Sequence, residues 1–131
     1  MAQYDLVGRF YFKQTSNGNL IGEYSNYAAL SANEPQVATE SADFLGDWDD
    51  SKDKFIGAYR SSWAYDGVAV FATLTITPHK SKNKLFTLEW RGIENYEGEG
   101  MLCDDILIGD YHPVPPRQAQ PNAPVSPLPS T

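Results

Sequence analysis

Leu20-Ile21-Gly22-Glu23-Tyr24 is one copy of a short motif in this chain: two bulky apolar residues, a glycine, any residue and an aromatic. Four further copies begin at Leu6, Phe44, Phe55 and Leu107. Side chains alternate between the two faces of a strand, so the glycine, the aromatic and the first apolar residue of each copy share one face. Glycine inside a strand is costly unless the sheet bends sharply or a ring lies over the bare backbone, and both occur in small closed barrels. The motif therefore predicts a small barrel with glycines beside rings.

The sequence around these copies divides into short runs rich in aromatic and β-branched residues, separated by turn residues. No long stretch repeats its apolar residues with the period of a helix, so the chain is predicted to be all-β. Asn17-Gly18 joins the first two runs and is typical of a tight antiparallel hairpin. We expect eight strands, over residues 6–14, 19–27, 36–44, 54–63, 69–77, 84–91, 95–102 and 106–111. Eight antiparallel strands joined mostly by short loops can close into an up-and-down barrel, which removes exposed edges.

The composition changes abruptly after His112, because seven of the last 19 residues are proline. This segment has almost no charge and no large apolar cluster, so it cannot form a core. We therefore expect a single barrel domain over residues 1–112 and an extended or disordered proline-rich tail over residues 113–131.

The formal net charge of −7 opposes binding to phosphate backbones, and only Lys80, Lys82 and Lys84 cluster, so we expect no nucleic-acid partner. The longest apolar-leaning stretch, residues 67–76, is far shorter than the roughly 20 residues of a membrane helix, and the first residues do not resemble a secretory signal. The single cysteine, Cys103, excludes an intrachain disulfide and fits a reducing compartment. These features predict a cytoplasmic protein without a membrane partner.

Strand alternation sorts the side chains into an outward and an inward set. The outward set is mostly charged: Arg9, Lys13, Glu23, Arg60, Thr75, Glu89, Arg91, Glu97, Glu99 and Asp110. The inward set is rich in aromatic residues: Leu6, Phe10, Phe12, Leu20, Tyr24, Asn26, Tyr59, Ser61, Trp63, Val70, Leu74, Ile76, Phe86, Leu88, Trp90, Tyr96, Leu102, Leu107 and Tyr111. Several of these inward side chains carry hydroxyl, amide or indole N–H groups, which need partners when they are buried.

Two interpretations of these inward polar groups remain open. In a filled barrel the rings would pack over the glycines, and the polar tips would bond to each other, to the backbone or to buried water. In a hollow barrel the same groups would line a pocket, for which a few polar groups among aromatic rings are the usual composition. If a pocket is present, the residues we expect to bind the ligand are Tyr24, Asn26, Tyr59, Ser61, Trp63 and Trp90.

The sequence shows no pattern of catalytic or metal-binding residues. His79 and His112 each adjoin a proline at a strand end, without a metal-like spacing, and no nucleophile motif is present. Residues 47–53 alternate oxygen-bearing side chains as a calcium loop does, but Lys52 replaces the glycine that such a loop needs. We therefore predict no catalytic residues, no metal site and no cofactor.

The first two predicted strands resemble those of avidins. Avidins belong to the calycins, as do lipocalins and fatty-acid-binding proteins. Gly8-Arg9-Phe10-Tyr11 and Asn19-Leu20-Ile21-Gly22-Glu23-Tyr24-Ser25-Asn26 carry the resemblance, by which Tyr24 and Asn26 match positions that contact a ligand head group. Phe12 replaces the polar contact residue of the first strand, and of the tryptophan-rich later strands only Trp90 is matched. The resemblance thus implies a calycin-like barrel and does not imply biotin binding.

The second half of the chain resembles small bacterial barrel modules of unassigned function. The matching elements are Gly57-Ala58-Tyr59, Asp66-Gly67, Ala72-Thr73-Leu74-Thr75-Ile76, Leu88-Glu89-Trp90 and Gly98-Glu99-Gly100-Met101-Leu102. This resemblance supports the barrel fold and implies no activity.

The function that the sequence predicts is non-covalent binding of a small molecule of unknown identity inside the barrel. One alternative is a solid barrel that serves as a protein-interaction module or associates with a second copy of itself. A second alternative is an isomerase or cyclase that controls a reactive substrate through the shape of its cavity. The absence of an acid-base pair favours a binding protein over an enzyme.

Overall fold

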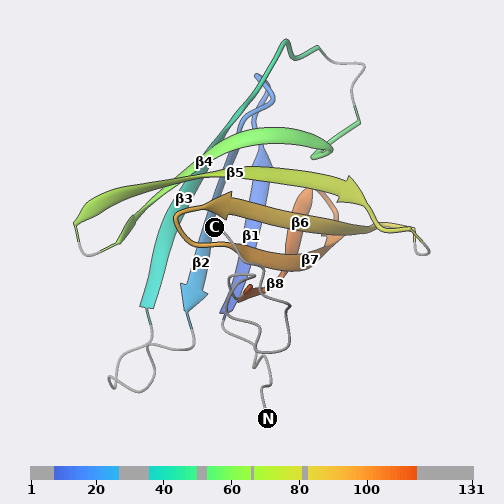
Figure 1. Ribbon diagram of the computed structural model, residues 1–131. Helices are drawn as coiled ribbons and strands as arrows, with labels where there is room; N and C mark the ends of the chain where they lie inside the picture. The colour runs from blue at the N-terminus through green and yellow to red at the C-terminus, as the bar shows by residue number, and fades with distance from the viewer. Residues whose placement is uncertain (1–7, 27–35, 50–52, 66, 81–82, 115–131) are drawn as a thin grey trace, which may run out of the picture.

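The computed structural model describes residues 8–26, 36–49, 53–65, 67–80 and 83–114. They form a closed antiparallel barrel in which each strand pairs with the next and the last pairs with the first (Figure 1). The strands are β1 (Gly8–Gln14), β2 (Leu20–Asn26), β3 (Gln36–Phe44), β4 (Gly57–Tyr65), β5 (Val68–Pro78), β6 (Leu85–Gly92), β7 (Tyr96–Cys103) and β8 (Ile106–Pro113). The predicted eight-stranded up-and-down barrel is confirmed. Within the described ranges, no helix is long and apolar enough to cross a membrane. Beyond Val114, the predicted tail lies outside the described residues.

Every strand begins and ends within three residues of its predicted bounds, and the largest difference is at the start of β4. This strand was expected to begin at Lys54, but the backbone of Phe55 has a φ of 69° and that of Gly57 a φ of 145°. The Phe55 N–H is donated to Gln14 Oε1 at 2.9 Å instead of to a neighbouring strand. The motif copy that begins at Phe44 continues beyond a strand, because β3 ends at Phe44, as predicted, and Gly46 has a φ of 106° in the following loop.

Glycines on the inward face allow neighbouring strands to approach one another closely. A Cβ atom at Gly98 would collide with the carbonyl oxygen of Asp110, and one at Gly109 would lie 2.7 Å from the Cα of Gly100 on the adjacent strand. At Gly8 a Cβ atom would lie 2.7 Å from the ring of Tyr111, as expected for a glycine beside an aromatic. These contacts are too short for any larger residue, so the glycines permit the tight coiling that closes the barrel.

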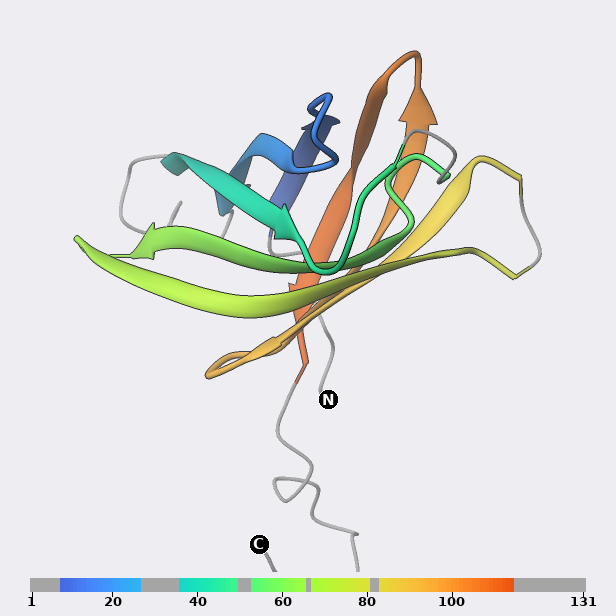
Figure 2. The same cartoon turned by 90° about the horizontal axis from the view of Figure 1, so that it is seen from above.

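The barrel is filled with side chains at one end. Eight large residues there are at most 1% exposed: Phe12, Leu20, Phe55, Tyr59, Leu74, Ile76, Leu88 and Leu107. They lie toward the end of the barrel where β1, β3, β5 and β7 end and β2, β4, β6 and β8 begin. At the opposite end β1, β3, β5 and β7 begin and β2, β4, β6 and β8 end (Figures 1 and 2). We call these the filled end and the open end.

Hydrogen bonds and rings close the filled end. The Tyr59 hydroxyl donates to the carbonyl oxygen of Phe55 at 2.9 Å and accepts from Gln14 Nε2 at 3.1 Å. The ring of Phe44 contacts those of Tyr59 and Trp48 at centroid distances of 5.5 and 5.1 Å. The Trp48 indole covers Gly18, where a Cβ atom would lie 2.7 Å from the indole Cε3. The Trp48 side chain therefore covers the filled end.

Candidate functional site

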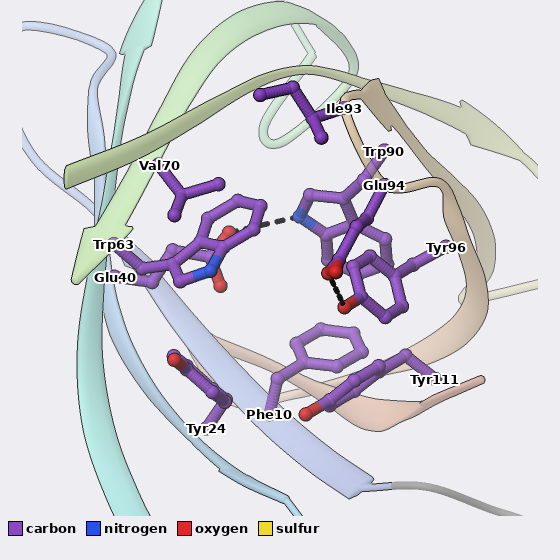
Figure 3. Close-up of a pocket in the computed structure, with 10 residues that line it drawn as sticks. All are labelled: Phe10, Tyr24, Glu40, Trp63, Val70, Trp90, Ile93, Glu94, Tyr96 and Tyr111. Atoms are coloured by element: carbon purple, nitrogen blue, oxygen red, sulfur yellow. Dashed lines mark hydrogen bonds between the residues drawn. The ribbon is translucent and has the colours of Figure 1, made fainter. Parts of the chain in front are cut away.

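The open end contains a cavity of about 380 Å³ inside the barrel (Figure 3). Its walls come from β1, β2, β3, β4, β5, β6, β7 and β8 and from the turn after β6. The lining residues are Phe10, Tyr24, Glu40, Trp63, Val70, Trp90, Ile93, Glu94, Tyr96 and Tyr111. The volume falls within the range of about 300–1,000 Å³ that is usual for small-molecule sites.

Glu40, in the middle of β3, places a carboxyl group inside this cavity. Its side chain is only 7% exposed, and the strand pairing sets Glu40 opposite Trp63 on β4 and Gly22 on β2. Alternation along β3 turns Ala38, Glu40 and Ala42 to the same face, and Ala42 is 1% exposed in the core. The backbone of β3 thus directs Glu40 into the barrel between two small side chains.

Two donors hold one oxygen of the Glu40 carboxyl group. Ser61 Oγ donates to Oε2 at 2.5 Å, and Trp90 Nε1 donates to the same atom at 2.9 Å. Among the described residues, none donates a hydrogen bond to the other oxygen, Oε1. Figure 3 shows the carboxyl group behind the Trp63 indole, joined to Trp90 by the dashed line. The side chain is thus fixed in orientation, and one oxygen is left to face the cavity.

Burial raises the pKa of Glu40 from an ordinary value of 4.5 to about 7. The hydrogen bonds from Ser61 and Trp90 stabilise the ionised form and act against this increase. Near neutral pH, Glu40 can therefore exist in either protonation state. Burial also raises the pKa of Tyr24, and the nearby Glu40 carboxylate raises it further.

Six aromatic rings stand around the carboxyl group as the walls of the cavity. Trp63 meets Tyr96 with centroids 6.4 Å apart and ring planes at 72°, and Tyr24 meets Tyr111 at 6.3 Å and 78°. Tyr96 and Tyr111 are 5.6 Å apart at 84°. Each ring therefore stands at a steep angle to its neighbour, an arrangement typical of stable aromatic pairs.

The hydroxyl and N–H groups of these walls differ in how they are bonded. Tyr111 donates to the carbonyl oxygen of Ser25 at 3.2 Å, and Tyr96 donates to Glu94 Oε1 at 2.6 Å at the rim. Within the described part of the chain, neither the Tyr24 hydroxyl nor the Trp63 indole N–H has a hydrogen-bond partner, and no unpartnered side-chain N or O atom is buried away from solvent. Both groups are therefore accessible to solvent, and both side chains line the cavity.

The structure places the six residues predicted to bind a ligand in different environments. Tyr24, Trp63 and Trp90 line the cavity together. Ser61 is fully buried beneath it and bonds to Glu40. Tyr59 belongs to the filled end, where its hydroxyl is bonded to Gln14 and Phe55 and burial raises its pKa to about 12. Asn26 ends β2, and its side chain lies outside what the structure describes.

Sequence reasoning missed the carboxyl group at the centre of the site. The run from Gln36 to Phe44 has few bulky residues, and the charged residues of the other strands are predicted to face water. The side chains of this run are therefore assigned to neither face of the sheet. The signal was nevertheless present, because Ala38, Ala42 and Phe44 alternate in phase with Glu40. The rim residues Ile93 and Glu94 were also missed, since they lie in the turn after β6.

The outward-facing acids are engaged at the surface. Glu97 pairs with Arg91 at 3.0 Å, and Glu99 lies 3.7 Å from His79. Among the described residues, no group of three or more His, Cys, Asp or Glu side chains is placed to hold a metal ion. The acidic stretch over residues 47–53 lies partly outside the described residues.

Comparison with protein-family models, with curated proteins and with solved structures gave no match to this chain.

Proposed function

We propose that this barrel binds a small organic molecule non-covalently in the cavity at its open end, with Glu40 as the polar anchor. One observation carries the proposal: a carboxyl group that is 7% exposed lies in a ring-walled cavity, with one oxygen held by two donors and the other unbonded among the described residues. A few placed polar groups among apolar walls are the usual composition of a ligand site.

The filled end argues against the alternative that the cavity is merely a packing defect. The same eight strands enclose Leu20, Leu74 and Leu107 at 0% exposure only a few residues further along the barrel. A buried carboxyl group is also costly, and an apolar residue at this position would avoid the cost. The combination of a hollow half and a buried acid therefore favours ligand binding over a purely structural role.

A matched pair of substitutions on β5 tests the proposal. Val70 lines the cavity, whereas the exposed Ala69 lies on the opposite face. N-phenyl-1-naphthylamine, an uncharged dye that fluoresces in apolar sites, serves as the probe. We expect saturable dye binding to the wild-type protein and to Ala69→Phe, and at least about a tenfold weaker affinity in Val70→Phe, because the added ring occupies the cavity.

Thermal unfolding of each variant checks that it is folded. Equal dye affinity in the Val70→Phe and Ala69→Phe variants would contradict binding inside the barrel, and so would an absence of saturable binding to the wild-type protein.

A further inference from the structure

We propose that the group recognised at Glu40 is positively charged, so that the cavity takes an organic ammonium or amidinium compound with an apolar body. This inference rests on the proposed binding function and adds the chemical class of the ligand. It is carried by the charges that line the cavity, by the rings around them and by the unbonded oxygen of Glu40.

The charged side chains that line the cavity are both acidic. Glu40 lies inside and Glu94 at the rim, and none of the described lining residues is Lys, Arg or His. Arg91 is committed elsewhere: it pairs with Glu97 at 3.0 Å and with Glu89 at 3.7 Å, and it donates to the carbonyl oxygens of Trp90 and Tyr96. An ionised Glu40 therefore has no counter-charge among the described lining residues, and a cationic ligand would supply one.

The aromatic walls favour the same charge. The face of an aromatic ring is electronegative, so rings that surround a site attract an ammonium group, and clusters of such rings bind quaternary ammonium ions. Here the pairs Tyr24–Tyr111, Trp63–Tyr96 and Tyr96–Tyr111 meet at 72–84°, which is the geometry of adjoining walls. Figure 3 shows these rings arranged around the space next to Glu40.

An anion would be disfavoured at this site for two reasons. A carboxylate or phosphate ligand would meet the like charges of Glu40 and Glu94, and the ring faces would repel it as well. The donors that could compensate are only the Tyr24 hydroxyl and the Trp63 indole N–H among those described without a partner. The overall charge of −7 would also slow the approach of an anion.

Three probes of similar shape test the charge preference. Benzyltrimethylammonium is permanently cationic, neopentylbenzene is its neutral carbon isostere, and phenylacetate is an anion of comparable size. Binding is followed by displacement of N-phenyl-1-naphthylamine at about pH 8.5, above the pKa of about 7 that burial gives Glu40. We expect the cation to bind at least about tenfold more tightly than its neutral isostere, and the anion to bind most weakly.

Two substitutions, each of which removes one carboxylate, show which carboxylate causes the charge preference. In Glu40→Gln the ratio of cation affinity to isostere affinity should fall to about a third or less of its wild-type value, while the isostere keeps its affinity. In Glu89→Gln, on the exposed outer face, the preference should stay within about twofold of the wild type. If Glu40→Gln does not fold, the wild-type comparison of the three probes still decides the matter.

The outcomes distinguish a failure of the charge preference from a failure of the proposed binding function. If the dye binds but the neutral isostere or the anion displaces it as well as the cation does, the charge preference is wrong and the binding function stands. A wild-type preference that persists undiminished in Glu40→Gln also overturns the inference. If the dye shows no saturable binding to the wild-type protein, both proposals fail.

Discussion

Glu40 combines burial, two hydrogen-bond donors on one oxygen and an oxygen without a described donor. Its carboxyl group is removed from bulk water, held at Oε2 by Ser61 and Trp90, and left at Oε1 without a described hydrogen-bond donor. Desolvation favours its neutral form, whereas the two donors favour its charged form. The balance places its titration near neutral pH, so its charge affects the stability of the protein and, if the proposed function holds, the binding of a ligand.

The stability of the free protein should therefore depend on Glu40 in a specific pH range. The pKa of Glu40 is raised from 4.5 to about 7 in the folded state, so the folded protein binds the proton more tightly than the unfolded chain does. The free energy of unfolding should fall as the pH rises from about 4.5 to about 7 and should level off above that. Tyr24 and Tyr111 face the same cavity and stay protonated throughout, because burial raises their pKa values too.

Urea unfolding of the wild-type protein and of Glu40→Gln at about pH 5 and pH 8 measures this effect. Between about pH 5 and pH 8, the free energy of unfolding of the wild type should fall by on the order of 2–3 kcal/mol more than that of Glu40→Gln. Glu89→Gln controls for the loss of one surface charge and should follow the wild type. A loss of the same size in Glu40→Gln would show that Glu40 does not titrate in this range.

The position of each inward residue along the barrel could not be predicted from the sequence. Alternation assigned Tyr59, Ser61 and Trp63 to one face, as the structure has them, but it does not tell how deep each lies. Strand pairing sets the depth: Tyr59 lies opposite Phe44 at the filled end, and Trp63 lies opposite Glu40 at the cavity. Register depends on contacts between distant segments, which local sequence patterns do not contain.

At the scale of the strands, glycines determine where neighbouring backbones can approach each other closely. Gly98 and Gly100 on β7 lie opposite Tyr111 and Gly109 on β8, so three of these four inward positions carry no side chain. The motif made this part of the fold predictable, because glycine weakens an apolar strand unless the backbone there must bend or meet a close neighbour. Gly46, in the loop after β3, and Gly57, the first residue of β4, instead have positive φ angles, which favour glycine.

Gly109→Ala should consequently be among the most destabilising small substitutions in the chain. Its Cβ atom would collide with the Glu99 carbonyl oxygen and lie 2.7 Å from the Cα of Gly100, and backbone atoms cannot move aside as side chains can. We expect a loss of about 3 kcal/mol or more in the free energy of unfolding.

Gly67→Ala is the control for Gly109→Ala. Nothing lies within 4 Å of a Cβ atom at Gly67, but its φ of 79° strains any other residue, so only about 1 kcal/mol should be lost. A loss at Gly109 no larger than that at Gly67 would contradict the role assigned to the close strand approach. Chemical unfolding of both variants provides the comparison.

At the scale of the whole molecule, the two ends of the barrel differ in packing and in the polar groups they leave unbonded. The filled end contains the residues with the lowest exposure and the strained Phe55 backbone, which Gln14 and Tyr59 hold in place. The open end contains the buried acid and the hydroxyl and indole groups without described partners. Stability should therefore depend on one end and binding on the other, and substitutions should separate the two properties.

Tyr59→Phe and Tyr24→Phe make the same chemical change at opposite ends. The Tyr59 hydroxyl accepts from Gln14 and donates to Phe55, so its removal leaves buried groups unsatisfied and should cost about 1–3 kcal/mol. The Tyr24 hydroxyl has no partner among the described residues, and its removal should change the free energy of unfolding by less than about 0.5 kcal/mol. N-phenyl-1-naphthylamine should bind to Tyr59→Phe within about twofold of its wild-type affinity, because the cavity walls are intact. If Tyr59→Phe lost dye affinity in proportion to stability, the two ends would be coupled, and the filled end would have to be counted as part of the binding site.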